Sequence, residues 1–184
     1  MPETKDLAAL VEAVLAVAGE PVGIEALAAA AGEGVNMEDL ERAVEFVRQR
    51  HDQPGSGLMV EQVGGGWRLA TRAEHEAALH SYLGFRAKAR LSQAALEALA
   101  IVAYRQPVTL PEINFLRGVN STAVVRTLLE RRLVVAAGRK QVVGTPLLYR
   151  TSKEFLIHFG LADLAALPTP EEVEQITGEN ASGA

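Results

Sequence analysis

The sequence predicts a mainly α protein made of two tandem winged helix-turn-helix domains, each with a small β-hairpin wing. Two observations support this fold class. Three short helical segments, followed by two apolar runs that suit a hairpin, occur in the second half of the chain and again in the first. A proline is followed by a glycine 11 residues later at Pro21 and Gly32, and the same spacing recurs at Pro107 and Gly118. This repeated spacing, at an offset of 86 residues, indicates a tandem duplication.

Charge divides the chain into the same two domains. Residues 1–83 carry 6 Lys/Arg against 14 Asp/Glu, whereas residues 84–167 carry 12 Lys/Arg against 5 Asp/Glu. We therefore expect an acidic N-terminal domain over residues 1–83, a linker over 84–90 and a basic C-terminal domain over 91–168. Residues 169–184 hold four glutamates and no base, and they are expected to form a flexible acidic tail.

Single residues set the expected elements of the N-terminal domain. Gly32 should end the second helix, and Asn36 should cap the third. The glycines at 64–66 are typical of a flexible hairpin tip, because the lysine and the spacing of a phosphate loop are missing. A capping box beginning at Thr71 predicts a last helix. The helices are expected over residues 4–18, 24–31, 36–50 and 71–83, and the strands over residues 58–63 and 67–71.

The C-terminal domain has clearer helix boundaries. Ser92 should cap its first helix, and Thr109 with Glu112 forms the capping-box pattern that begins the second. Gly118 suits a left-handed helix end, and Ser121 should cap the third helix. The helices are expected over residues 92–105 and 109–118, from residue 121 and from residue 151, with a short one after residue 169. The strands are expected over residues 134–136 and 147–149.

Composition excludes several functional classes. The chain has no cysteine, so neither a disulfide nor a thiolate site is expected. His75 and His80 are five positions apart, off a common helical face, so no metal or other cofactor is expected. No apolar run reaches the roughly 20 residues of a membrane span, and no basic start of a signal peptide precedes residues 7–18. We therefore expect a non-enzymatic protein of the cytoplasm.

The first predicted helix, residues 4–18, is apolar on nearly every side. Such a helix is either the central core helix of a small domain or a helix that also takes part in a subunit interface. The second interpretation predicts a homodimer through the N-terminal domain. Its candidate dimerisation residues are Leu7, Leu10, Val11, Val14 and Leu15.

Six sequence segments, in order across residues 91–168, resemble the segregation and condensation protein B family. They are LSQAALEALAIVAYRQPVT, RGVNS, RTLLERRLV, GRK, PLLYRTSKEFLIHFGL and DLAALP. The resemblance is looser, and more architectural than literal, from Lys5 to Leu83. It implies an accessory subunit of the bacterial chromosome-condensing complex, which acts at the nucleoid in chromosome condensation and partition during cell division. It also implies a homodimer through the first domain, and a second domain that binds a kleisin and through it a structural-maintenance-of-chromosomes ATPase.

The residues of the second domain leave two binding modes open. Its basic residues lie where a DNA-reading winged helix meets phosphates, so a transcriptional regulator that uses this domain is the alternative. Few Asn or Gln side chains accompany them for base contacts, and DNA binding is expected to be weak or indirect. A kleisin helix instead requires apolar anchors with a charged rim, although both phenylalanines concerned could simply be core residues. The candidate partner-binding residues are Phe115, Phe159, Arg117, Arg126, Arg139 and Lys140.

Overall fold

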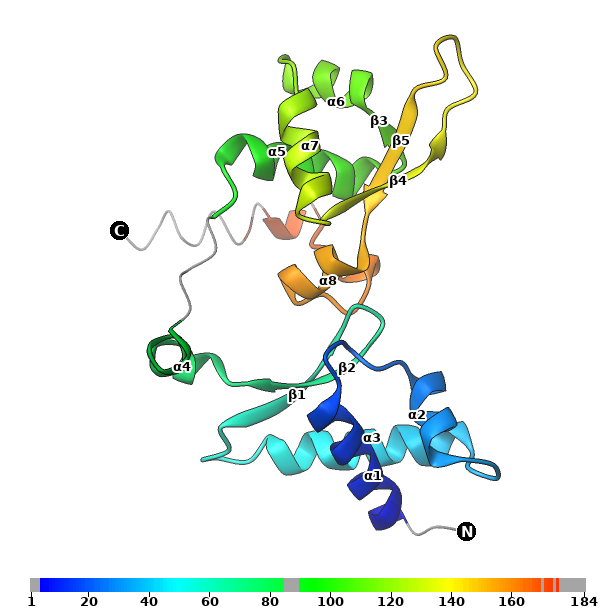
Figure 1. Ribbon diagram of the computed structural model, residues 1–184, viewed down its shortest axis with the longest axis vertical. Helices are drawn as coiled ribbons and strands as arrows, with labels where there is room; N and C mark the ends of the chain where they lie inside the picture. The colour runs from blue at the N-terminus through cyan, green and yellow to red at the C-terminus, as the bar shows by residue number, and fades with distance from the viewer. Residues whose placement is uncertain (1–3, 85–89, 170, 174, 176–184) are drawn as a thin grey trace.

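The computed structural model describes residues 4–84, 90–169, 171–173 and 175, and it shows two units with a similar order of elements (Figure 1). The N-terminal unit (residues 4–83) consists of α1 (Thr4–Val17), α2 (Ile24–Ala31), α3 (Met37–His51), β1 (Leu58–Val63), β2 (Gly66–Thr71), a 3₁₀ turn (Ala73–His75) and α4 (Glu76–Leu83). The C-terminal unit (residues 91–168) consists of α5 (Gln93–Arg105), β3 (Val108–Thr109), α6 (Leu110–Arg117), α7 (Thr122–Glu130), β4 (Val134–Arg139), β5 (Leu147–Thr151), α8 (Lys153–Phe159) and a 3₁₀ turn (Leu164–Ala166). The predicted class, mainly α with two hairpin wings, is confirmed.

The core of the N-terminal unit forms where α1 packs against α3. Both helices place apolar residues at helical spacing, so each presents one continuous face to the other. Trp67 of β2 and Val22, which precedes α2, cover this core from the side of the hairpin. The buried residues of this core are Leu7, Ala8, Val11, Leu15, Leu27, Leu40, Ala43, Val44, Val47 and Val60.

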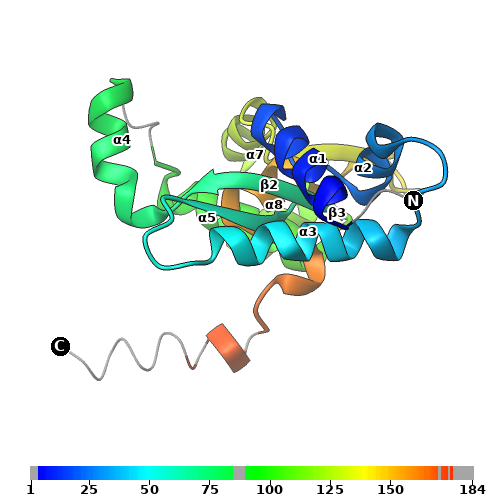
Figure 2. The same cartoon turned by 90° about the horizontal axis from the view of Figure 1, so that it is seen from below.

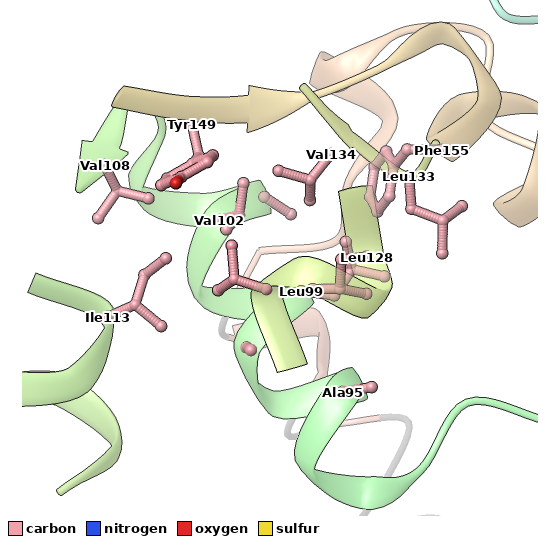
Figure 3. Packing of buried hydrophobic residues seen from close by; sticks show 13 residues of the cluster. Ala95, Leu99, Val102, Val108, Ile113, Leu128, Leu133, Val134, Tyr149 and Phe155 are labelled. Atoms are coloured by element: carbon pink, nitrogen blue, oxygen red, sulfur yellow. The ribbon is translucent and has the colours of Figure 1, made fainter. Parts of the chain in front are cut away.

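The core of the C-terminal unit is larger and collects side chains from every helix of the unit (Figure 3). Helix α5 runs through its centre and contributes Leu99 and Val102, which are 2% and 0% exposed. Phe155 of α8 and Tyr149 of β5 close the core from the side of the hairpin. Because α8 supplies a fully packed aromatic ring, it is an integral part of this unit.

The two hairpins differ in their turns. Strands β1 and β2 pair antiparallel from Leu58 with Thr71 to Val63 with Gly66, which leaves a two-residue turn. Strands β4 and β5 pair with a shift in register between Ala136 and Arg139, and a long tip joins them. The short strand β3 adds to β5, so the strand order of the second sheet is β3-β5-β4.

The predicted repeat is visible in the backbone of both units. In the N-terminal unit, the amide of Val22 donates to the Trp67 carbonyl at 2.8 Å, and the Trp67 amide donates back at 2.9 Å. In the C-terminal unit, Val108 of β3 is the antiparallel partner of Tyr149 in β5. Val22 and Val108 are 86 residues apart, so the predicted offset relates two structurally equivalent positions.

Most predicted helix caps are present. Asn36 Oδ1 accepts from the amides of Glu38 and Asp39, and the Ser92 hydroxyl accepts from the amide of Ala95. Thr109 and Glu112 form the predicted capping box, and Gly118 has the left-handed backbone expected at a helix end. These local signals are reliable because each satisfies amide or carbonyl groups that a helix end leaves unpaired.

Two predicted caps are wrong. At Thr71 there is no capping box in the described part of the chain, because a 3₁₀ turn begins α4 and Arg72 reaches back to the His51 carbonyl at 2.9 Å. At Ser121 the hydroxyl accepts from Arg117, and the Asn120 side chain accepts from the amide of Thr122 at the start of α7. At residue 72 the arginine contact spans 21 residues, whereas at Ser121 the neighbouring Asn120 side chain supplies the bond that the hydroxyl was expected to make.

Helix α4 lies apart from the remainder of the N-terminal unit in two perpendicular views (Figures 1 and 2). Apart from the half-buried Leu79, all its side chains are exposed, including Tyr82 at 85% and Leu83 at 52%. An isolated helix of eight residues is marginal in water, and α4 buries little of its surface against the described residues of the chain.

The predicted linker and the predicted acidic tail fall largely outside the described residues. Of the linker at 84–90, only the ends, Gly84 and Arg90, are described. In the tail, Thr169 and Glu172 exchange capping hydrogen bonds at 2.7 and 3.3 Å, and residues 171–173 are helical, as predicted.

Candidate functional site

The first candidate surface is the helix-turn-helix face formed by α6, the following turn and α7. Phe115 on α6 is 85% exposed, so it is not a core residue. Leu116 and Val119 beside it are also half exposed or more. These three residues form a small apolar patch at the end of α6 and in the turn after it, and Figure 1 shows α6 at the top of the C-terminal unit.

Arg117 does not belong to a charged rim, and this prediction is wrong. Its side chain is only 8% exposed. The guanidinium donates to the Ser121 hydroxyl at 2.9 Å and to the Glu97 carboxylate at 3.0 Å. Arg117 therefore ties α6 to α5 and to the start of α7, and its role is structural.

The other three basic candidates also have partners within the chain. Arg126 forms an ion pair with Glu130, one turn later on α7, at 2.9 Å. Arg139 donates to the Thr145 carbonyl across the base of its own hairpin tip at 3.0 Å. The exposed Arg126–Glu130 pair is weak, but it offsets one positive charge on the face, whereas the neutral Thr145 carbonyl offsets none.

Lys140 joins the hairpin to the start of α6. Its ammonium lies 2.5 Å from the Glu112 carboxylate, which also accepts from the amide and the hydroxyl of Thr109. The hydrogen bond from Lys140, followed by those from Thr109, lowers the pKa of Glu112 to about 2. Glu112 therefore stays ionised at neutral pH and holds both partners.

These contacts disfavour the regulator alternative. A DNA-reading winged helix requires free cations and amide side chains on its third helix and wing. Here the outer face of α7 presents an internally paired arginine, and the hairpin cations bond to their own unit. The hairpin tip is apolar, since Val142 and Val143 are 48% and 103% exposed.

The second candidate surface is a groove between α5 and α8, which we name the α5–α8 groove. Its floor is an apolar stripe on α5 that consists of Leu96, Ala100 and Tyr104, at i, i+4 and i+8. Leu96 and Tyr104 are 41% and 48% exposed, so no described residue covers the stripe. The groove comprises two adjoining hollows of about 700 and 370 Å³, which share Leu96 and Phe159.

The walls of the groove come from α8 and from the segment that follows it. Phe159 is 44% exposed, and its ring lies 4.9 Å from the buried ring of Phe155. We name residues 161–168 the C-terminal strap. Its Leu161 and Leu167 line the groove, and the Tyr104 hydroxyl donates to the Pro168 carbonyl at 2.7 Å. Both walls are therefore anchored to α5.

Charge gathers at one end of this groove. Arg90 and Arg131 line the larger hollow together with His158. An apolar floor with a basic end is suited to an amphipathic helix that carries acidic residues near one terminus. An apolar lining with few polar groups is less suited to catalysis, and no cluster of three or more metal-ligating side chains is found within the described residues.

The structure does not bring Phe115 and Phe159 into one site. Helix α6 lies at the far end of the C-terminal unit from α8, with α5 and α7 between them (Figure 1). The expectation of a single groove that combines both phenylalanines with Arg117, Arg126 and Arg139 is therefore wrong. Phe159 belongs to the α5–α8 groove, and Phe115 belongs to a separate patch.

The candidate dimerisation residues also divide into two groups. Leu7, Val11 and Leu15 are 4%, 1% and 3% exposed and form part of the N-terminal core, as the alternative interpretation of this helix required. They are not available to contact a second copy. Leu10 and Val14 are half-buried and remain candidates.

Sequence reasoning missed most residues of the α5–α8 groove. A second apolar stripe lies beside the core stripe of α5 and consists of Leu96, Ala100 and Tyr104. Their spacing of four residues could have indicated a second apolar face of this helix. The C-terminal strap offered a weaker signal, since DLAALP has no strong periodicity. Its path back over α5 depends on tertiary contacts that no local pattern contains.

Comparison with known proteins identifies the family. A family model described as "Segregation and condensation complex subunit ScpB" matches residues 9–170. Segregation and condensation protein B of Syntrophotalea carbinolica is 44% identical over 183 residues, which are 98% of this chain and 90% of that protein. No helix in the described part of the chain is long and apolar enough to span a membrane.

Two solved structures are also similar. The crystal structure of ScpB from Mycobacterium tuberculosis is 34% identical and covers 88% of this chain and 99% of that chain, with a TM-score of 0.42. A dimer of an ScpB N-terminal domain complexed with an ScpA peptide is 27% identical and covers 44% of this chain and 99% of that chain, with a TM-score of 0.40. On the extent of the family match and of the sequence identity, the chain belongs to the family of the segregation and condensation complex subunit ScpB.

Proposed function

We propose that the chain is a non-enzymatic scaffold subunit whose α5–α8 groove binds an amphipathic helix of the kleisin. The observation that carries this proposal is the uncovered stripe of Leu96, Ala100 and Tyr104, with a basic end at Arg90 and Arg131. Through the kleisin the chain would join a structural-maintenance-of-chromosomes ATPase. It would act at the nucleoid, in the cytoplasm, in chromosome condensation and partition.

The physical case is that of a helix-in-groove interface. Apolar anchors at i, i+4 and i+7 of a partner helix would replace water over the stripe, and burial of such anchors supplies most of the affinity. The basic end would set the orientation by attracting acidic residues. DNA contacts would be weak or indirect, because the cations of the helix-turn-helix face are engaged within the unit.

We further propose a homodimer through the N-terminal unit. Tyr82 and Leu83 on α4 are uncovered, and this helix needs a support that its own unit does not supply. Leu10 and Val14 on α1 are half-buried and could contribute to the same interface. A second copy placed against α4 would cover this exposed apolar surface and hold the helix in place.

Calorimetric titration of the full chain with the middle segment of the kleisin tests the groove. Leu96→Ala should weaken binding by about tenfold or more, since truncation of a central anchor costs about 2 kcal/mol. Phe115→Ala is the matched control, because it removes an exposed apolar side chain of the same unit outside the groove. Weakening by Phe115→Ala with unchanged binding by Leu96→Ala would move the site to α6. Absence of binding by the unsubstituted chain would overturn the proposed function.

A further inference from the structure

The hairpin tip of the N-terminal unit is bonded to the C-terminal unit. The Gly64 amide donates to the Leu161 carbonyl at 2.9 Å, and the Gly65 amide donates to the Ala162 carbonyl at 2.8 Å. Hairpin tips normally lie in solvent. Here the β1–β2 tip instead reaches the end of α8 (Figure 1).

Side chains close the same contact. Lys153 at the start of α8 donates to the Pro21 carbonyl at 3.3 Å and lies 4.0 Å from the Glu20 carboxylate. Val63, next to the turn, is 0% exposed, although it belongs to neither of the two core clusters. A fully buried valine beside a hairpin tip indicates that the other unit covers this end of the hairpin.

The two accepting carbonyls belong to the first residues of the C-terminal strap. Leu161 lines the α5–α8 groove, and Asp163, two residues on, caps the 3₁₀ turn at Leu164–Ala166 through the amides of Ala165 and Ala166. Tyr104 holds the other end of the strap at Pro168. The strap is therefore fixed at Pro168 by its own unit. Its start is held from two sides: the Leu161 amide donates to the Leu156 carbonyl of α8 at 2.9 Å, and the Leu161 and Ala162 carbonyls accept from the hairpin of the N-terminal unit.

We infer that the β1–β2 tip is a positioning element for the α5–α8 groove: it bonds the start of the strap and so holds the wall of a site in the other unit. The part of this inference that concerns partner affinity rests on the proposed function. The part that concerns the contact between the units and the order of the strap does not. It follows that the start of the strap is held from both sides only in the full chain.

A side chain at position 64 is disfavoured for a reason that position 65 does not share. Both residues have positive φ, 59° and 75°, as a two-residue hairpin turn demands. A Cβ at Gly64 would lie 3.0 Å from Cγ1 of Ile157 and 3.4 Å from Cγ of Lys153, whereas a Cβ at Gly65 would meet nothing within 4 Å. The two positions thus form a matched pair. Both need a left-handed backbone, but only a side chain at position 64 would press against α8.

Asparagine tolerates the left-handed backbone, so Gly64→Asn and Gly65→Asn should both preserve the hairpin. Only Gly64→Asn should push the tip away from α8. Adding Ile157→Ala to Gly64→Asn removes the nearest atom and should restore the contact. The chain has no cysteine, so Glu41→Cys on α3 and Ala123→Cys on α7, both exposed, give two unique sites for spin labels.

Two measurements on the full chain, without any partner, test the inference. Double electron–electron resonance, with excess unlabelled chain to suppress distances between copies, should give one narrow distribution for the unsubstituted chain and for Gly65→Asn. Gly64→Asn should broaden it, and Ile157→Ala should narrow it again. Hydrogen exchange at Ala165, Ala166 and Leu167 should be faster in Gly64→Asn alone.

The outcomes separate the inference from the proposed function. A broad distribution for the unsubstituted chain, or equal behaviour of Gly64→Asn and Gly65→Asn, would overturn the contact. Unchanged exchange in the strap despite a broadened distribution would overturn the positioning role. If Gly64→Asn leaves the tip docked only about one tenth of the time, kleisin affinity should fall about tenfold, because only the competent fraction binds. Loss of kleisin binding by every chain, including the unsubstituted one, would contradict the proposed function and leave the distance and exchange results to decide the inference.

Discussion

The N-terminal and C-terminal units repeat one architecture but use its last elements differently. In the N-terminal unit the hairpin ends in a tight two-glycine turn that contacts the other unit, and α4 projects into solvent. In the C-terminal unit the hairpin ends in a long exposed tip, and α8 packs Phe155 into the core. The order of elements is therefore retained, while the turns and the last helix decide which surfaces remain open.

This difference assigns separate tasks to the two units. The C-terminal unit completes its own core and still exposes an apolar stripe on α5, which fits the proposed binding of a partner helix. The N-terminal unit leaves a whole helix uncovered, which suits contact with a second copy. The basic charge of the second unit fits a partner segment that carries acidic residues.

The largest expected effect is a difference in stability between truncations of α8 and of α4. Phe155→Ala should cost about 3–5 kcal/mol of unfolding free energy, because the ring is 3% exposed in a packed core. Leu79→Ala on α4, where the side chain is only half-buried, should cost far less. Hydrogen exchange of α5 amides, followed as a function of urea concentration, would measure the stability that the C-terminal unit loses in Phe155→Ala. Fluorescence of Trp67, the only tryptophan, should show that the N-terminal unit keeps its stability in Phe155→Ala.

A smaller effect is expected at the start of α6. Thr109→Ala removes the hydroxyl that accepts from the Glu112 amide and should cost about 1 kcal/mol of stability in the C-terminal unit. Thr109→Ser retains the hydroxyl and is the control. Equal urea midpoints for all three proteins would show that the capping box does not stabilise this unit.

The pH dependence of the same site gives a third test. The pKa of Glu112 is lowered from 4.5 to about 2, so its carboxylate contributes stability that is fully present above about pH 4.5. That contribution should be lost as the pH falls through about 2, since the folded state must then bind a proton. Glu112→Gln lacks the charge, so its stability difference from the unsubstituted chain should be constant at neutral pH and shrink below pH 4.5. A difference that persists unchanged at pH 2 would contradict the ionic role of Glu112.

The smallest effect concerns α2, which begins at Gly23 without a side-chain cap. Gly23 has φ of −72°, so Gly23→Ser fits the backbone and supplies a hydroxyl to the free amides. A gain of a few tenths of a kcal/mol is expected. Gly23→Ala changes the backbone in the same way without the hydroxyl, and an equal gain there would assign the effect to the backbone alone.

The sequence predicted local features better than long-range ones. Caps at Asn36, Ser92 and Thr109 were correct because each involves neighbours within three residues. The predictions failed where a side chain acts over a distance. Arg117 was expected at a rim but is buried against Glu97, which lies 20 residues earlier in the chain.

The site itself was predictable only in part. Phe159 was left open between a core residue and a partner-binding residue, and it is 44% exposed. Its neighbours Leu96 and Tyr104 were not singled out. The contact of Gly64 with Leu161 joins residues about 100 positions apart. A glycine has no side chain, so the sequence around it could not predict this contact. The separation of Phe115 from Phe159 likewise depends on how α6 and α8 are placed around α5.

The most direct test of the central claim locates the kleisin on the full chain. A photoreactive benzoylphenylalanine can replace Tyr104 in the groove, Phe115 on α6 or Phe46 on α3, three aromatic residues that are 48%, 85% and 40% exposed. Irradiation with the kleisin present should produce a crosslink from position 104 and none from position 115. The Phe46 position tests binding to the N-terminal unit. Crosslinking from position 115 or 46, with none from position 104, would contradict the assignment of the partner site to the α5–α8 groove.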